Sequence, residues 1–179
     1  KIAKSYKQIK QLLFYEKYAL VHVHTPVAAA EVRLAAKDYN DAIDRRSKEG
    51  KPVPGRLKVI YTAHGFHFYD GAPKKNWILY YPIEKYVSKY TDVLITINKE
   101  DYKRAISHFH EKRTFYVPGV GVDVKKFSDV CIDRNKRRKE LGVSPEDFLL
   151  ISVGELSARK NQIVVLKALA EIKRKKPEI

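Results

Sequence analysis

The chain has 179 residues, of which 44% are hydrophobic, and it carries 36 lysines and arginines against 21 acidic residues. This composition excludes a disordered chain, and the length supplies enough apolar side chains for one large domain or parts of two. The formal charge of +15 suits nucleic acid, anionic lipid or a polyanionic ligand such as a nucleotide. Charge alone does not separate these partners, but the sequence has no RNP-type, zinc-finger or helix-turn-helix signature for specific nucleic-acid recognition.

Other features of the sequence indicate where the protein works. Cys131 is the single cysteine, which excludes a disulfide within the chain and favours a reducing compartment, the cytoplasm. No signal peptide is recognised, and no apolar run reaches the roughly 18 residues that a spanning helix needs. The chain contains no methionine, and we therefore expect it to be a fragment of a longer protein.

The first part of the chain alternates between helix and strand patterns. Apolar residues at helical spacing predict a helix over residues 1–13. Residues 18–24 (YALVHVH) predict a strand, residues 28–37 an Ala-rich helix, and residues 57–62 (LKVIYT) a second strand. The polar segment 38–56 carries Pro52, Pro54 and Gly55, and it is interpreted as a loop or an excursion from the fold.

The same alternation continues after a turn that is rich in histidine. Residues 79–90 predict a helix, residues 92–97 (DVLITI) a strand, and residues 114–117 (TFYV) a further strand. Between the two strands, Asn98 is expected to cap a helix that has Asp101 at its third position. This order predicts an α/β fold with a Rossmann-like parallel sheet, in which binding sites gather at the carboxyl ends of the strands.

The composition changes in the last third of the chain. Residues 118–147 contain three glycines, two prolines and a dense basic stretch, and they predict an interdomain linker. Residues 148–154 (FLLISVG) then predict a new buried strand, and residues 165–172 a new amphipathic helix. We therefore expect residues 1–117 to belong to one domain and residues 148–179 to begin a second.

The turn after the predicted strand 148–154 is a candidate anion site. Gly154 lets the backbone leave the strand tightly, the next helix presents free amide groups, and Lys160 can reach an anion that lies there. The alternative is a solvated lysine in an ordinary strand-to-helix loop. The turn is not a P-loop, because no Gly-rich stretch leads into a Gly-Lys-Ser/Thr sequence.

Histidines gather where two predicted strands end. His22 and His24 share one face of the first strand, and His64 and His67 lie in the turn VIYTAHGFHFYDG at residues 59–71. Four imidazoles suit zinc, but without a supporting cysteine they more often hydrogen-bond to the backbone or to a ligand.

Hydrolytic chemistry finds less support in the sequence. A lipase-like oxyanion loop is excluded because the chain has no Gly-x-Ser-x-Gly elbow. Glu31 and Glu155 lie near strand-to-helix junctions, but their spacing does not pair them for glycoside hydrolysis.

No Asp-x-Asp pair is present to chelate a metal-bound nucleotide. The aromatic run WILYYPIEKY at residues 77–86 suits either a packed core or a membrane interface.

Five stretches together resemble bacterial retaining glycosyltransferases of the GT-B type, family 4-like, that build capsular polysaccharide or exopolysaccharide. They are VHVHTP, VIYTAHGFHFYDGAP, YYPIEKYVSKYTDVLITINKED, YVPGVGVDVKKF and LLISVGELSARKN. The resemblance implies two Rossmann-like lobes facing a cleft, with a nucleotide-sugar donor on the carboxyl-terminal lobe and the acceptor on the amino-terminal lobe. The chain would supply the later part of the amino-terminal lobe and the start of the carboxyl-terminal lobe.

The resemblance also implies a donor-binding turn. Lys160 matches a lysine of the family that contacts the donor diphosphate. Gly154, Glu155 and Asn161 belong to the same expected donor-binding set. Glu155 stands where the family often has a basic residue, so that first diphosphate contact differs in this chain.

On the amino-terminal side, His64 matches a histidine that the family places near the donor sugar and the reacting centre. His64 and Lys160 are therefore the expected catalytic residues. His24, Gly65 and His67 are expected to line the acceptor site or the cleft.

The expected partners follow from the same resemblance. They are a nucleotide-sugar donor and a saccharide or lipid-linked acceptor, with no cofactor, no metal and no specific nucleic acid. The basic surface would place a cytoplasmic enzyme beside the anionic inner face of the cell membrane. Two other functions stay open on the sequence: a non-catalytic binding or scaffolding module of a two-part complex, and a basic nucleic-acid-binding domain.

Overall fold

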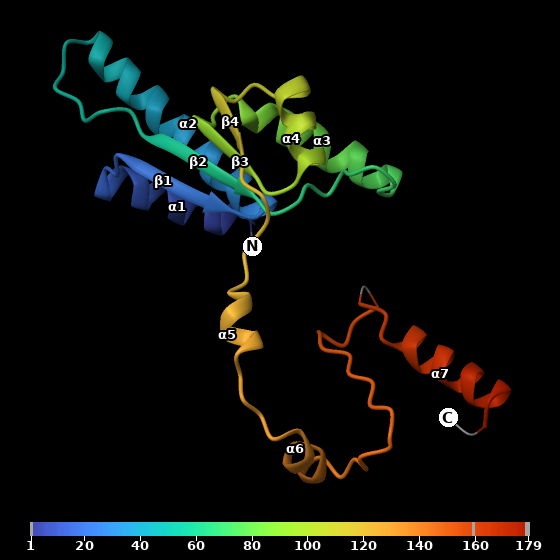
Figure 1. The fold of residues 1–179 in the computed structure, drawn as a ribbon. Helices are drawn as coiled ribbons and strands as arrows, with labels where there is room; N and C mark the ends of the chain where they lie inside the picture. Colours follow the sequence, from blue (N-terminus) through green and yellow to red (C-terminus); the bar gives the residue numbers. More distant parts are fainter. Residues whose placement is uncertain (1, 159, 178–179) are drawn as a thin grey trace. The chain divides into compact units, whose positions relative to one another are not determined.

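The computed structural model describes residues 2–158 and 160–177, and the chain divides into two compact units, Lys1–Gly121 and Val122–Ile179. Among the described residues of the first unit, the strands form one four-stranded parallel sheet in the order β1-β2-β3-β4 (Figure 1). The strands are β1 (Leu20–His24), β2 (Lys58–Ala63), β3 (Val93–Thr96) and β4 (Arg113–Tyr116). The predicted α/β fold with a Rossmann-like parallel sheet is confirmed.

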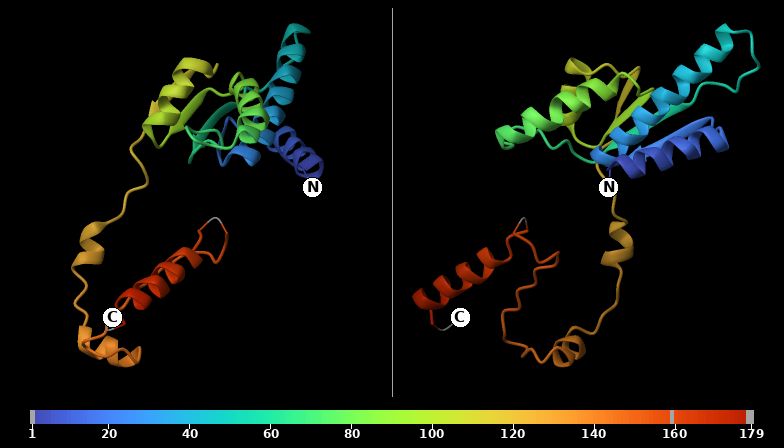
Figure 2. Two further views of the ribbon diagram at one scale, coloured as in Figure 1. Left: turned by 90° about the vertical axis from the view of Figure 1, so that its right-hand side faces the viewer. Right: turned by 180° about the vertical axis from the view of Figure 1, so that it is seen from behind.

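One layer of helices covers one face of this sheet. The helices are α1 (Ile2–Glu16), α2 (Pro26–Lys48), α3 (Lys74–Ser88) and α4 (Lys99–His108). Helices α2, α3 and α4 each connect neighbouring parallel strands, and such crossovers are right-handed, so the three lie on the same face. Helix α1 packs beside α2, and α2 beside α3, as the view from behind shows (Figure 2).

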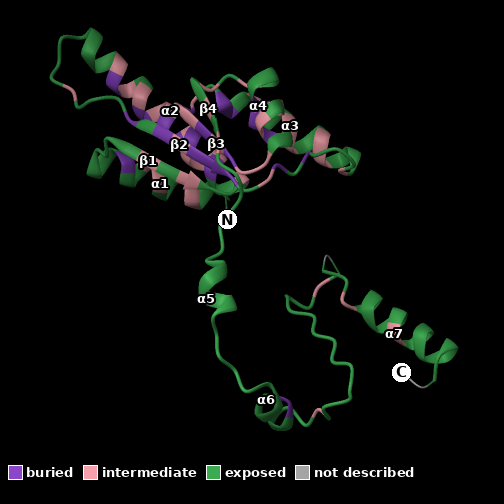
Figure 3. Ribbon diagram, viewed as in Figure 1, coloured by how far each residue is buried: buried purple, intermediate pink, exposed green. Residues whose placement is uncertain are grey.

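The hydrophobic core lies between the sheet and these helices. Side chains alternate between the two faces of a strand, and in β2 the residues Val59, Tyr61 and Ala63 are all buried toward the helices. Burial is concentrated on the central strands and on the helix faces that meet them (Figure 3). The opposite face of the sheet is less covered within the described residues, and Phe115 of β4 is half exposed there.

Helix α2 is longer than the sequence suggested. The prediction of a loop or excursion over residues 38–56 is wrong for its first half, because the helix continues to Lys48. Tyr39 and Ile43 extend the apolar stripe by a further turn and are buried against Leu13 of α1 and Leu57. The outward-facing residues of this part of α2 are charged. The segment is therefore polar on average, although one face of the helix is apolar, and its sequence predicts a loop or an excursion.

A buried ion pair fastens α2 to α3. The guanidinium of Arg33 donates to both carboxylate oxygens of Glu84, at 2.5 and 3.0 Å, and Nε of Arg33 donates to the Ala29 carbonyl at 3.0 Å. The same guanidinium lies over the ring of Tyr61, 4.3 Å from its centroid. The pair therefore links two helices to the central strand β2.

The second unit contains α5 (Val124–Ser128), α6 (Arg134–Glu140) and α7 (Ile163–Lys175). Helix α7 confirms the helix predicted around residues 165–172. The strand predicted over residues 148–154 is not formed, and these residues run irregularly with Val153 almost fully exposed. A strand needs a neighbouring strand to pair with its backbone N–H and C=O groups. The described residues 122–158 and 160–177 contain no strand that could pair with residues 148–154.

The predicted limits of the interdomain linker and of the second domain stay predictions. Throughout the described part of the chain, every helix is too short or too polar to cross a bilayer.

Candidate active site at the carboxyl edge of the sheet

Two histidines meet where β1 and β2 end. His24 is the last residue of β1, and His64 directly follows the last residue of β2. The strands are parallel, with His24 opposite Thr62, so both imidazoles lie at the carboxyl edge of the sheet. Nδ1 of His24 lies 3.0 Å from Nε2 of His64, which is hydrogen-bonding distance.

A third imidazole extends this pair. The ring of His22 lies 4.4 Å from that of His24, centroid to centroid, and the ring of His64 lies 5.3 Å from that of His24, so the three form a histidine row. Nε2 of His22 is hydrogen-bonded to Oγ1 of Thr62 at 2.8 Å. Partial burial lowers the pKa of His22 below its usual value, and repulsion from His24 lowers it further. The row therefore favours a neutral imidazole at its inner end.

The bond between His24 and His64 has chemical consequences. One of the two nitrogens must donate and the other must accept, so at most one of the two rings carries a positive charge while the bond persists. In neutral His64, the bond made by Nε2 sets whether Nδ1 is a donor or an acceptor, because the two ring nitrogens have complementary roles. The pair can therefore present an oriented imidazole to a hydroxyl group of a ligand.

The backbone that carries His64 is fixed by a buried carboxylate. Asp101 accepts a hydrogen bond from the Phe66 amide at 3.0 Å and another from Nδ2 of Asn98 at 2.7 Å. Asn98 in turn accepts from the Asp101 amide at 2.8 Å, which confirms the predicted N-cap of α4. Gly65, whose φ is +138°, makes the turn between these anchored residues possible.

Asp101 and Thr62 are residues that the sequence did not assign to this site, and His22 was considered there only as a possible zinc ligand. The Asn98 cap pattern predicted a helix start, and it could have drawn attention to Asp101. Nothing in the local sequence shows that the same carboxylate also holds the Phe66 amide from another loop.

His67 faces a different neighbour from His64. Its ring stacks on Tyr80 of α3 with centroids 4.6 Å apart, and its carbonyl accepts a hydrogen bond from Asn76 at 2.9 Å. The four histidines weighed as zinc ligands thus split into a row of three and one that packs on α3. Across residues 2–158 and 160–177, no three His, Cys, Asp or Glu side chains are grouped to hold a metal ion.

The expected donor-binding residues form one turn in the second unit. The Lys160 and Asn161 amides both donate to the Ser157 carbonyl, at 3.1 and 3.0 Å. Nε2 of Gln162 donates a hydrogen bond to the Glu155 carbonyl at 2.8 Å. A Cβ atom added to Gly154 would lie 3.4 Å from the same nitrogen.

This turn leads directly into α7, and Asn161 has the left-handed φ of +52°. Lys160 is exposed beside the start of that helix. The roles predicted for Gly154, Glu155, Lys160 and Asn161 stay predictions.

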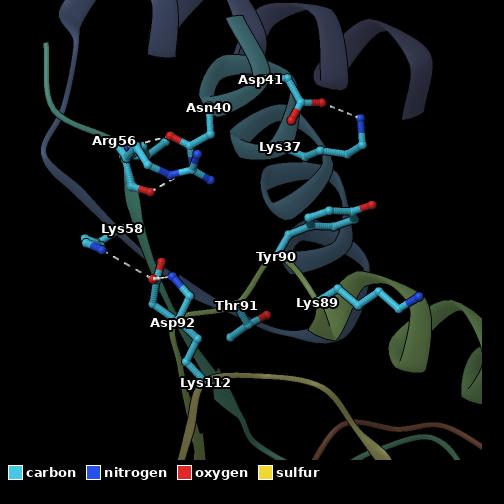
Figure 4. Close-up of a pocket in the computed structure, with 11 residues that line it drawn as sticks. Lys37, Asn40, Asp41, Arg56, Lys58, Lys89, Tyr90, Thr91, Asp92 and Lys112 are labelled. Carbon is cyan, nitrogen blue, oxygen red and sulfur yellow. Dashed lines mark hydrogen bonds and ion pairs between the residues drawn. The ribbon is translucent and has the colours of Figure 1, made fainter. Parts of the chain in front are cut away.

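A basic hollow lies at the opposite, amino edge of the sheet (Figure 4). Its volume is about 220 Å³. Most of its cations already have partners: Lys37 pairs with Asp41 at 2.8 Å, and Lys112 pairs with Asp92 at 2.7 Å. Lys58 lies 3.6 Å from the same Asp92 carboxylate. Because parallel sheets bind ligands at the carboxyl edge, the histidine row is the better candidate site.

Comparison with known proteins shows which proteins this chain resembles. The sequence model of Glycosyltransferase Family 4 matches residues 2–126. Over 176 residues, the chain is 42% identical to the putative glycosyltransferase EpsD of Bacillus subtilis (strain 168), which covers 97% of the chain and 43% of that protein.

Two more distant relatives match almost as much of the chain. One is the UDP-Gal:alpha-D-GlcNAc-diphosphoundecaprenol alpha-1,3-galactosyltransferase of Escherichia coli, 28% identical over 92% of the chain and 39% of its own length. The other is an uncharacterized 41.2 kDa protein in the cps region of Klebsiella pneumoniae, 26% identical over 90% of the chain and 41% of its own length.

The chain thus spans about two-fifths of the length of these curated relatives. The family match covers both histidine-bearing strand ends and the Asn98–Asp101 anchor. It also agrees with the parallel sheet of the first unit. The chain belongs to Glycosyltransferase Family 4.

Proposed function

We propose that the full-length protein that carries this chain is a retaining glycosyltransferase of cell-surface polysaccharide synthesis, capsular or extracellular. It transfers a sugar from a nucleotide-sugar donor to a saccharide acceptor. The observation that carries this proposal is the hydrogen-bonded pair of His24 and His64 at the carboxyl edge of a family 4 sheet. An imidazole pair held by the strand ends is suited to bind and orient sugar hydroxyl groups.

In this proposal His64 contacts the donor sugar near the reacting carbon, and His24 is a positioning residue. By engaging Nε2 of His64, His24 holds the ring in one orientation and sets the role of Nδ1 toward the sugar. The Asp101 carboxylate supports the arrangement by holding the Phe66 amide, two residues after His64.

The leaving diphosphate is assigned to the turn before α7. As the glycosidic bond breaks, negative charge grows on the diphosphate oxygens. Lys160 and the positive dipole end at the start of α7, which no side chain caps, are suited to neutralise this charge, without a metal ion. Gly154, Glu155 and Asn161 shape the turn around the diphosphate.

For the acceptor we propose a saccharide linked to a lipid diphosphate. The relative from Escherichia coli is named for an acceptor of this kind, a diphosphoundecaprenol. Such a lipid resides in the membrane, and the formal charge of +15 favours an anionic membrane surface. We therefore place the enzyme in the cytoplasm, at the inner face of the cell membrane.

A panel of nucleotide sugars tests the proposal directly. Purified full-length protein is incubated with each donor, and release of the nucleotide is measured with and without a lipid-diphosphate saccharide. We expect turnover with at least one donor. Lys160→Ala should lower it by about 10²-fold, the scale on which one charge-stabilising donor acts. Lys167→Ala, an exposed lysine of α7, is the matched control and should leave turnover unchanged.

Release of nucleotide from no donor in the panel would contradict the proposed transfer. Unchanged turnover in Lys160→Ala would contradict the role of that lysine alone.

A further inference from the structure

An apolar groove runs between α2 and α3 in the first unit. Its volume is about 420 Å³, within the range of pockets that hold small ligands. Val27 and Leu34 of α2 form one wall, and Leu79 and Ile83 of α3 form the other. Leu79 and Ile83 are one helical turn apart, and both are about half exposed. The groove is thus an open apolar surface and not a closed part of the core.

The acidic groups that border the groove already have partners. Glu84 accepts two hydrogen bonds from the buried guanidinium of Arg33, and Glu31 accepts one from the Ser5 hydroxyl at 2.5 Å. These bonds satisfy the carboxylates from within the fold. The groove therefore offers hydrocarbon contact with few unmet polar groups, which favours an apolar occupant.

The groove continues to the carboxyl edge of the sheet. Its lining includes His67 and Tyr80, whose rings stack on each other. His67 follows His64 by three residues, so their Cα atoms are at most about 11 Å apart even in a fully extended chain. One end of the groove therefore lies close to the proposed sugar site.

A cation lies on the same stripe of α3. Lys75 precedes Leu79 by four residues, and residues four apart are neighbours on a helix surface. Lys75 is exposed, one turn nearer the start of α3 than the apolar wall. Along this helix the surface thus passes from positive charge to hydrocarbon.

We propose that this groove binds the first isoprene units of a polyprenyl-diphosphate acceptor, with the diphosphate beside Lys75. The inference rests on the proposed function and names the acceptor site on this chain. The groups present suit the three parts of the ligand: histidines for the sugar, a lysine for the diphosphate and an apolar groove for the prenyl chain. Each buried methylene strengthens binding by a factor of about four. The affinity should therefore rise with the length of the prenyl chain that the groove buries.

Calorimetry on the full-length protein tests the groove without any need for turnover. The probes are inorganic diphosphate, dimethylallyl diphosphate with one isoprene unit, and farnesyl diphosphate with three. We expect farnesyl diphosphate to bind at least about tenfold more tightly than dimethylallyl diphosphate. The double substitution Leu79→Gln with Ile83→Gln should abolish this difference. Ile78→Gln is the matched control, because Ile78 is an even more exposed apolar residue of α3 that does not line the groove.

Lys75→Gln is a separate variant. It should lower the affinity for all three probes to a similar extent, because all three carry the diphosphate. Circular dichroism of each variant checks that α3 is retained.

Equal affinity for the two prenyl probes in the wild type would overturn the inference. So would an equal loss in Ile78→Gln and in the groove variant. If the groove variant lost binding to neutral phosphatidylcholine vesicles but kept its farnesyl affinity, the groove would meet membrane acyl chains and the inference would be wrong. If a second copy of the chain or another segment occupied the groove, it would block farnesyl diphosphate. The two prenyl probes would then bind with equal affinity, which would also overturn the inference.

These outcomes are separable from failure of the proposed function. Farnesyl binding through Leu79 and Ile83 together with no sugar transfer would retain the groove and reject the transferase. Sugar transfer that is equally efficient to methyl-diphosphate and farnesyl-diphosphate saccharides would retain the transferase and reject the groove.

Discussion

Replacing Glu84 with glutamine should destabilise the first unit severely. Arg33 is fully buried, Glu84 is 4% exposed, and the carboxylate receives both arms of the guanidinium. The neutral amide leaves the buried positive charge of Arg33 without its paired carboxylate, although the Ala29 carbonyl and the face of Tyr61 still contact the guanidinium. Breaking a buried pair from one side costs about 3–5 kcal/mol.

This cost translates into a large shift in melting temperature. Unfolding entropy near the transition is about 2.1 cal/mol/K per residue, which gives about 0.25 kcal/mol/K for a unit of this size. A loss of 3–5 kcal/mol therefore lowers Tm by about 12–20 °C. Thermal unfolding of the 179-residue chain can be followed by the fluorescence of Trp77, the single tryptophan.

Two further variants make the reasoning refutable. Asp41→Asn breaks an exposed pair with Lys37 and should cost at most about 1 kcal/mol. Joint replacement of Arg33 by Met and Glu84 by Leu removes both charges and should restore most of the lost stability. The account of the pair is wrong if Glu84→Gln melts within a few degrees of the wild type, or if the double variant is as unstable as the single one.

Two other substitutions probe the edges of the sheet. Asp92→Asn should cost about 1.5–3 kcal/mol at neutral pH, because the carboxylate accepts from Lys112 and from the Val59 amide. Burial raises the pKa of Asp92, but these bonds outweigh it and the net pKa is lowered. Its contribution is therefore complete above the unfolded pKa of about 4 and is lost as the pH falls through the lower folded value. Urea unfolding at pH 7 and pH 3 measures the difference in free energy of unfolding between variant and wild type. We expect this difference to shrink at pH 3, and an equal difference at both pH values would contradict the role of the carboxylate. Asn98→Ala should cost about 1 kcal/mol as a lost helix cap and speed amide exchange near Asp101, and unchanged exchange would argue against that anchor.

The architecture was predictable because its signals are local. Each strand of the first unit is short and rich in β-branched or aromatic residues, and each helix shows a 3.6-residue period, so the alternation predicted the parallel sheet. The carboxyl-edge rule then predicted that His24 and His64 lie at the same edge. Their hydrogen bond confirms that expectation of proximity.

The errors and omissions come from interactions between distant segments. The extension of α2 depends on Leu13 and Leu57, which bury its last apolar turns but lie far away in sequence. The segment 148–154 has strand propensity, yet a strand forms only beside another strand. The bond between His22 and Thr62 depends on the register of two strands, which neither strand specifies alone.

The central claim is that the histidine row at the carboxyl edge takes part in sugar transfer. Its most direct test is the turnover of full-length His64→Ala with the donor that the panel identifies. His110→Ala, an exposed histidine in the loop before β4, is the control. We predict a loss of about 10²-fold or more in kcat for His64→Ala and none for His110→Ala. Wild-type turnover in a folded His64→Ala protein would contradict the account.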